Sequence, residues 1–221
     1  TSIRRDSQGF ELATDNPDHP SLSTDAVVLA IPSYIAAELL TPIAPDLATQ
    51  LAKIRYLSAA TISLGYRKED LPPGQSLDGF GFLIPKAENR DIVACTWTST
   101  KFDHRSDSDH VLVRAFAGGY SQPDIDDLSD ETLLAKAQAE VAALMGITAV
   151  PVTHRIFRWK QGSPQYDVGH LDRVAQMEGL ASQIPGLYLT GSAYRGVGLP
   201  DCVRAAKQTA QLIYDQFDQN Q

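Results

Sequence analysis

The sequence predicts an α+β fold, with an antiparallel or mixed sheet and helices in the middle of the chain and incomplete α/β elements at its two ends. Four apolar segments in the middle follow one another without a helical pattern between them, which is typical of antiparallel sheets. Near each end, a continuous apolar run precedes a helical pattern, which favours parallel strands. The 221 residues suffice for one large domain or roughly one and a half.

The first quarter of the chain predicts a hairpin, a strand and two helices. Residues 3–14 alternate in polarity around a polar turn, as a β-hairpin requires. A polar, proline-containing stretch follows, residues 15–24. Residues 25–32 form a continuous apolar run closed by Pro32, which predicts a strand buried on both faces. Two helical segments separated by prolines come next: residues 33–40 and 46–54.

The middle of the chain predicts five strands and one helix. Because turn clusters separate the first four strands, we expect an antiparallel meander. The helix begins after its N-cap Ser129 and ends at Gly146. The strand candidates are residues 60–67, 79–84, 92–97, 111–116 and 151–159. At least half of four strand aromatics are expected in the core: Tyr66, Phe80, Phe82 and Trp97.

The last part of the chain predicts a helix, a strand, a turn and a final helix. Apolar residues recur at helical spacing over residues 171–181, and residues 187–190 form a short apolar run. A glycine-rich turn then leads into a helix over residues 200–217.

The composition excludes several classes of function. With 27 acidic and 19 basic residues, the chain has a formal charge of −8 and no polybasic patch, which argues against nucleic-acid binding. No apolar run approaches the ~18 residues of a membrane span. The two cysteines lack metal-ligand spacing and suit a reducing compartment, so we expect no metal and a cytoplasmic location. The first residues are polar and do not begin with Met, which indicates a cut point rather than a signal peptide.

One segment has a pattern suited to chemistry, the turn Gly196–Asp201. Glycines in a strand-to-helix turn let a ligand approach the backbone, and N–H groups at a helix start favour an anion. The pattern is similar to G-x-G-x-x-G with Asp201 in the third glycine place. No second strand follows the helix, so the turn is expected to be the second half of a cofactor site whose first half precedes residue 1.

Three segments of the chain resemble protoporphyrinogen oxidases. Residues 188–202, YLTGSAYRGVGLPDC, resemble the C-terminal flavin-contact segment of that family. Residues 159–170, WKQGSPQYDVGH, resemble its Trp…Pro-Gln-Tyr…Gly-His stretch, and residues 25–32 resemble its strand-Ile-Pro segment. The resemblance covers nearly the whole chain in order, but the family's N-terminal G-x-G-x-x-G and the acid after its second strand are missing. The chain is therefore interpreted as the C-terminal half of such an enzyme.

The resemblance implies FAD as the cofactor and a fold that joins a Rossmann-like FAD-binding domain to a substrate domain. It implies that residues 1–56 and 170–221 belong to the FAD-binding domain and residues 57–169 to the substrate domain. The implied reaction removes six electrons from a porphyrinogen in haem biosynthesis and passes them to oxygen. The implied FAD contacts are Val27, Trp159, Val197, Gly198 and Leu199. No side chain is identified as a catalytic acid or base.

Other candidate residues have simpler interpretations. His170 is expected to be a polar residue at the start of a helix, and Cys202 a buried thiol. His104 and His110 flank a loop with Asp103, Asp107 and Asp109, which is expected to be a solvated turn. Arg195 is open to two interpretations, an exposed turn arginine or a partner for a carboxylate of flavin or substrate.

Two alternative functions remain at this stage. One is another amine-oxidase-like flavoenzyme, of the monoamine oxidase or carotenoid desaturase type. The other is a module without enzyme activity that binds a tetrapyrrole or a protein. The sequence does not distinguish protoporphyrinogen from coproporphyrinogen as the substrate. We expect the isolated chain to be inactive, to form oligomers through uncovered apolar strands, and to be at most peripheral to a membrane.

Overall fold

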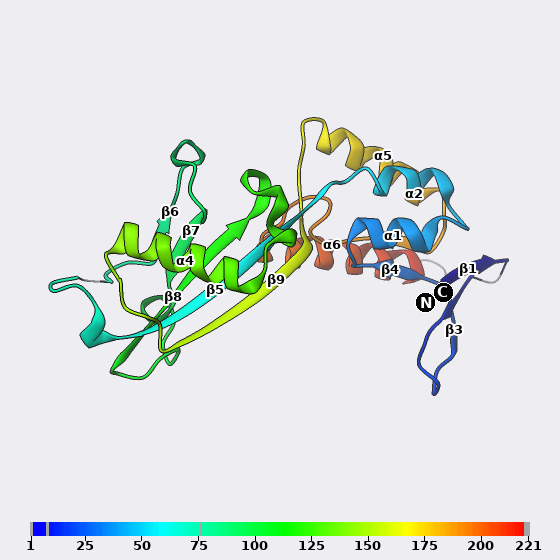
Figure 1. Cartoon of the computed structure of the whole chain (residues 1–221). Helices are drawn as coiled ribbons and strands as arrows, with labels where there is room; N and C mark the ends of the chain where they lie inside the picture. Colours follow the sequence, from blue (N-terminus) through cyan, green and yellow to red (C-terminus); the bar gives the residue numbers. More distant parts are fainter. Residues whose placement is uncertain (1, 8, 76, 219–221) are drawn as a thin grey trace. The chain divides into compact units, whose positions relative to one another are not determined.

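The computed structural model describes residues 2–7, 9–75 and 77–218 and divides the chain into two compact units (Figure 1). Unit 1 comprises Thr1–Tyr56 and Pro164–Gln221, and unit 2 comprises Leu57–Ser163. The second division lies earlier than the boundary expected at residue 169. Residues 164–169 bond within unit 1, since the Gln165 N–H donates to the Arg55 carbonyl at 2.8 Å.

Unit 1 contains two small sheets and four helices. Strands β1 (Ser2–Asp6), β2 (Gly9–Ala13) and β3 (Ser21–Thr24) form an antiparallel sheet, in which β2 is central. Strands β4 (Val27–Leu29) and β10 (Leu187–Leu189) form a separate parallel pair. The helices are α1 (Ser33–Leu40), α2 (Pro45–Leu51), α5 (His170–Ser182) and α6 (Leu199–Asp218).

The core of unit 1 joins α1, α2 and α5 to the parallel pair. Its most deeply buried side chains include Leu40, Leu47, Leu51, Val174 and Met177, each at most 1% exposed. Full burial of each such side chain stabilises the fold by about 1.5–3 kcal/mol. Helix α6 differs from the other three, because none of its residues is buried.

Unit 2 is a five-stranded sheet in the order β6-β7-β8-β5-β9, with helix α4 (Asp130–Met145) on one face (Figure 1). Its strands are β5 (Tyr56–Arg67), β6 (Gly81–Leu83), β7 (Ala94–Trp97), β8 (His110–Gly118) and β9 (Thr153–Pro164). Short helices connect them: η1 (Lys68–Asp70), η2 (Lys86–Glu88), α3 (Thr98–Lys101), η3 (Gly119–Ser121) and η4 (Pro123–Asp127).

The ends of α4 follow from its sequence. The Ser129 side chain accepts a hydrogen bond from the Thr132 N–H, and Gly146 adopts the left-handed conformation with φ 68°. These are the expected N-cap and C-terminal glycine, and each satisfies backbone groups that the helix leaves unpaired. Leu133, Ala137 and Val141 then pack on the sheet with at most 2% exposure.

Of the four strand aromatics, three belong to this core, as expected. Tyr66 is buried, Phe82 and Trp97 pack against the cluster, and Phe80 is exposed.

Residues 21–24, for which no strand was predicted, pair with the second edge of β2 as β3. The structure corrects three expectations. Helix α2 ends at Leu51, and a turn occupies the last expected helical residues. Val28 is 42% exposed because side chains alternate along β4: Val27 and Leu29 enter the core, and Val28 points to the other face. Only β6, β7 and β8 form a meander, since β5 pairs with β8 along the length of β8.

Candidate functional site

The glycine-rich turn lies at the carboxyl ends of the two parallel strands of unit 1. β4 and β10 run side by side, with Leu29 opposite Leu189, and the Thr190 N–H donates to the Leu29 carbonyl at 3.1 Å. The chain then passes through residues 191–198 and enters α6 at Leu199. The carboxyl edge of a parallel sheet is the usual place for a ligand, because loops and helix starts meet there.

Gly196 has a conformation that other residues rarely adopt. Its φ is +146°, and a Cβ at this position would lie 2.4 Å from the Asp201 Cβ. The turn therefore folds back tightly on the first turn of α6, and a side chain at position 196 would prevent this.

An aromatic pair from the start of α5 fixes the turn. The Tyr166 and His170 rings stack, with centroids 3.7 Å apart and an angle of 12°. The Tyr166 hydroxyl donates to the Ser192 carbonyl at 2.6 Å and accepts from the Gly196 N–H at 2.9 Å. The His170 Nε2 lies 2.7 Å from the Tyr194 carbonyl and so carries the donated hydrogen. Burial raises the pKa of Tyr166, which keeps this hydroxyl protonated.

The start of α6 leaves backbone donors unpaired. Within the described residues, no backbone acceptor bonds the N–H groups of Val197, Gly198 and Leu199, whereas the Cys202 N–H reaches the Gly198 carbonyl at 3.0 Å. Val197 and Leu199 are exposed. Three N–H groups at a helix start can bind an anion or a polar ring edge.

The structure brings together three of the five expected cofactor residues, Val197, Gly198 and Leu199. Val27 lies in β4 opposite Leu187, and its N–H donates to the Gly186 carbonyl at 2.8 Å, so this group already serves the sheet. Trp159 lies on β9 of unit 2 and is 57% exposed, which leaves its ring accessible. The cofactor roles of all five remain predictions.

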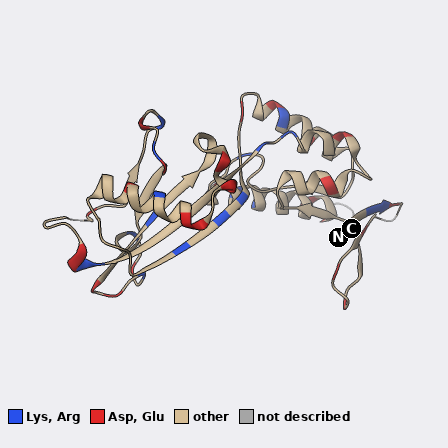
Figure 2. Ribbon diagram, in the orientation of Figure 1, with Lys and Arg blue, Asp and Glu red and all other residues tan. Residues whose placement is uncertain are grey.

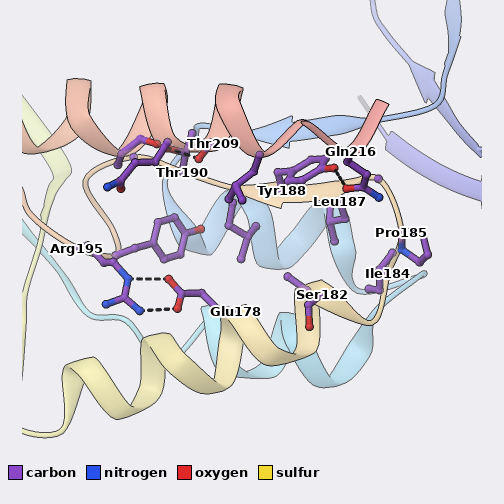
Figure 3. Close-up of a pocket in the computed structure, with 18 residues that line it drawn as sticks. Glu178, Ser182, Ile184, Pro185, Leu187, Tyr188, Thr190, Arg195, Thr209 and Gln216 are labelled. Carbon is purple, nitrogen blue, oxygen red and sulfur yellow. Dashed lines mark hydrogen bonds and ion pairs between the residues drawn. The ribbon is translucent and has the colours of Figure 1, made fainter. Parts of the chain in front are cut away.

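A groove of about 550 Å³ runs beside β10 in unit 1 (Figure 3). Its floor is the strand from Gly186 to Thr190, and its walls come from α5 and α6. The Gly186 carbonyl and the Thr190 N–H bond to β4. Because backbone groups alternate in direction along a strand, those of Leu189 point to the groove. The groove therefore contains an unpaired strand edge.

Two buried hydroxyl groups in the groove, those of Thr190 and Tyr194, have no hydrogen-bond partner among the described residues. Burial raises the pKa of Tyr194 well above its usual range. Arg195 bonds to Glu178 through its Nε at 2.8 Å, and this carboxylate raises the pKa of the guanidinium (Figure 3). Arg195 is exposed, as the interpretation of an exposed turn arginine expected, and it also has an internal carboxylate partner that was not predicted.

The other residues singled out in the sequence are the loop around His110 and the thiol of Cys202. The His110 Nδ1 lies 2.6 Å from Asp107 in an exposed turn, and this hydrogen bond lowers the pKa of Asp107. No group of three metal-ligating side chains occurs among the described residues.

Cys202 is half-buried, so the expectation of a buried thiol is wrong: it lies on α6, where no described residue is buried. No described helix is long and apolar enough to cross a membrane.

Sequence reasoning missed the roles of Tyr166 and His170. Both residues lie in the segment 159–170 that resembles protoporphyrinogen oxidases, and their spacing of four residues was a signal that the two rings could meet. Gly169 adopts the left-handed conformation, φ 82°, immediately before α5 begins at His170. The pairing of Arg195 with Glu178 has no local sequence signal.

A family model described as flavin containing amine oxidoreductase matches residues 1–214. Coproporphyrinogen III oxidase of Bacillus subtilis is 32% identical over 208 residues, which cover 94% of this chain and 43% of that protein. The chloroplastic protoporphyrinogen oxidase of Oryza sativa is 30% identical over 226 residues, with 97% and 42% coverage.

Among solved structures, "Putative protoporphyrinogen oxidase" from Exiguobacterium sp. 255-15 is 36% identical, with a TM-score of 0.81. The match covers 96% of this chain and 45% of that chain. The chain thus spans less than half the length of these relatives.

Proposed function

The chain belongs to the family of flavin-containing amine oxidoreductases, and on this premise we propose that it is part of an FAD-dependent porphyrinogen oxidase of haem biosynthesis. The resemblance to protoporphyrinogen oxidases predicted from the sequence is confirmed by relatives with such names. The proposed reaction removes six electrons from protoporphyrinogen IX or coproporphyrinogen III and transfers them to oxygen.

One observation carries this proposal, the turn between β10 and α6. Its unpaired N–H groups, the close backbone approach at Gly196 and the position at the carboxyl end of a parallel sheet fit one wall of a flavin site. A flavin, when bound, supplies the electron transfer. The part of this chain is to hold the ring: Val197, Gly198 and Leu199 donate N–H groups to its polar edge.

Residues outside the turn also contribute to the proposed flavin site. The stacked pair of Tyr166 and His170 holds the turn rigid, which lowers the entropy lost when a ligand binds. In the proposal, Val27 contacts FAD through its backbone and Trp159 lies near the isoalloxazine ring. Because the G-x-G-x-x-G turn that the chain lacks, with the helix after it, would supply the pyrophosphate contacts, the isolated chain is proposed to be inactive.

The proposal includes oxygen as the oxidant and a cytoplasmic location, at most peripheral to a membrane. The two free cysteines support a reducing compartment. Relatives of both names, coproporphyrinogen III oxidase and protoporphyrinogen oxidase, match the chain, so the proposal retains both substrates.

The test is a chimera in which this chain replaces the matched 208 residues of the Bacillus subtilis relative. We expect a retained flavin absorbance spectrum and oxygen-dependent formation of fluorescent porphyrin. A chimera that retains flavin and oxidises amines, but neither porphyrinogen, would support the amine-oxidase alternative. A folded chimera that binds porphyrin without flavin would support the binding module.

A matched pair of variants tests the turn itself. Leu199→Pro removes one N–H donor at a helix start, where Pro is tolerated, and Leu199→Ala removes only an exposed side chain. We expect Leu199→Pro to weaken FAD binding about tenfold and Leu199→Ala to leave it unchanged. The same pair can be titrated with FAD in the isolated chain. Equal FAD affinity of the two variants would contradict a role for the N–H group.

A further inference from the structure

One face of the unit 2 sheet packs against α4, and the other face has a different character. Val113 and Ala115 of β8 are fully buried against α4, as are Ile62 and Leu64 of β5. Because side chains alternate along a strand, Arg114 and its neighbour Ser63 lie on the opposite face, here called the open face.

Arg114 is a half-buried, oriented cation on the open face. Ser63 lies directly opposite it in the β5–β8 register and is 8% exposed. The Arg114 Nε donates to the Ser63 hydroxyl at 3.1 Å, which fixes the plane of the guanidinium. Its two terminal nitrogens have no hydrogen-bond partner among the residues that the structure describes, and no described carboxylate lies within ion-pair distance.

Arg158 of the same sheet is an arginine whose guanidinium has hydrogen-bond acceptors within unit 2. It bonds to Asp130 and to the carbonyls of Ile125 and Leu128, on the α4 side. A guanidinium that is partly removed from water normally has such an acceptor, since an unpaired charge is costly to desolvate. The terminal nitrogens of Arg114 have no such acceptor among the described residues, so they are available to donate to an anionic group.

The open face around Arg114 combines small polar and aromatic side chains. Thr96 of β7 lies opposite Arg114 on the side away from Ser63. Phe116 lies two residues further along β8, about 7 Å away. β9 lies beyond β5, about 10 Å from β8, and its exposed Phe157 and Trp159 point away from the α4 side, to which Arg158 turns. Arg155 lies over the Phe157 ring at 5.4 Å, among the basic bands of β9 in Figure 2. This face suits a flat apolar molecule with a carboxylate at its edge.

We propose that Arg114, oriented by Ser63, is a carboxylate-binding site that holds a side-chain carboxylate of the porphyrinogen on the open face of unit 2. This inference rests on the proposed function for the identity of the ligand. Arg114 presents both terminal nitrogens to the carboxylate as a bidentate pair. Ser63 is a positioning residue, because it acts only through Arg114.

The test uses coproporphyrin III and its tetramethyl ester as probes, titrated by fluorescence into the 221-residue chain. The variants are Arg114→Gln, with Lys160→Gln as a control that removes the same charge from β9. We expect Arg114→Gln to raise the Kd of the acid about tenfold and that of the ester less than twofold. Lys160→Gln should leave both values unchanged. An equal effect on acid and ester, or wild-type protein that binds both probes equally or not at all, overturns the proposal.

A second pair of variants tests the positioning role. Ser63→Ala should weaken binding of the acid about threefold, and Ser63→Thr, which keeps the hydroxyl, should restore it. Wild-type affinity in Ser63→Ala would remove Ser63 from the proposal. Thermal melts of each variant separate these effects from loss of folding.

The outcomes are distinct from those of the proposed function. If the chimera retains no flavin but Arg114→Gln still discriminates acid from ester, the carboxylate site stands and the oxidase function falls. If the chimera oxidises porphyrinogen and Arg114→Gln leaves the Kd of the acid unchanged, the oxidase function stands and the carboxylate site falls.

Discussion

Gly196 shows how a single residue determines the shape of the candidate site. With φ +146° and no room for a Cβ, it allows the chain to turn back on Asp201 and to expose the N–H groups at the start of α6. The tight turn also lets the Cys202 Sγ approach the Gly196 carbonyl at 3.7 Å. The site thus depends on a backbone conformation more than on any one side chain.

We therefore predict that Gly196→Ala destabilises the chain by about 1–3 kcal/mol and weakens FAD binding, because the strained φ and the contact with Asp201 both oppose the native turn. Gly179→Ala is the control: Gly179 lies within α5, and a Cβ there meets nothing within 4 Å. It should stabilise the chain by up to about 1 kcal/mol. Urea denaturation measures both changes, and equal midpoints for the two variants would contradict the prediction.

At the scale of helices and strands, the sequence predicts those features that depend on a few adjacent residues, such as helix ends and tight turns. Ser129 and Gly146 mark the ends of α4, and the glycine pattern at residues 196–198 marks the turn, because capping and positive φ depend on a few adjacent residues. The position of β5 between β8 and β9 has no such signal, since pairing partners far apart in sequence decide it. The same reason hides the hydrogen bonds of Tyr166 with Ser192 and Gly196 and the pairing of Arg114 with Ser63.

Two buried side chains, Tyr66 of β5 and Cys95 of β7, are expected to make unit 2 less stable at alkaline pH. Burial raises the pKa of Cys95 and of Tyr66 to about 12 each. The folded state keeps these protons, while the unfolded chain releases them above about pH 8.5 for Cys and 10 for Tyr. Since both pKa values are higher in the folded state, their stabilisation is complete below about pH 8.5 and is lost as the pH rises toward 12.

We predict that Cys95→Ala reduces this loss between pH 9 and 11, by up to about 1.4 kcal/mol for each pH unit. The measurement is the urea midpoint as a function of pH, compared with Cys202→Ala to show that the effect belongs to Cys95. A pH dependence of Cys95→Ala equal to that of the wild type would show that this thiol does not ionise on unfolding.

At the scale of the whole molecule, unit 1 has surfaces that its own residues do not cover. The β4–β10 pair has only two strands, the groove contains the unpaired edge of β10, and α6 has no buried residue. Val203, Leu212 and Tyr214 of α6 are each more than half exposed. An unpaired strand edge beside exposed apolar side chains favours association with another chain.

We therefore predict that the purified chain self-associates through the groove and α6. Leu212 is 62% exposed and lines the groove, so Leu212→Lys places a charge in the proposed contact. We expect sedimentation velocity at micromolar concentration to show dimers or larger species for the wild type and at least tenfold weaker association for Leu212→Lys. Val168→Lys, at a fully exposed position outside the groove, should behave as the wild type.

The alternative outcomes identify what covers unit 1. A wild-type chain that sediments as a monomer would contradict self-association and would mean that the exposed edge tolerates water. If association instead disappears when the remaining part of the Bacillus subtilis relative is added, that part competes for the same groove. Because the relatives are more than twice as long as the matched segment, this competition is the expected result. The surface that drives self-association in the isolated chain would then be the surface that contacts the remaining part of that relative.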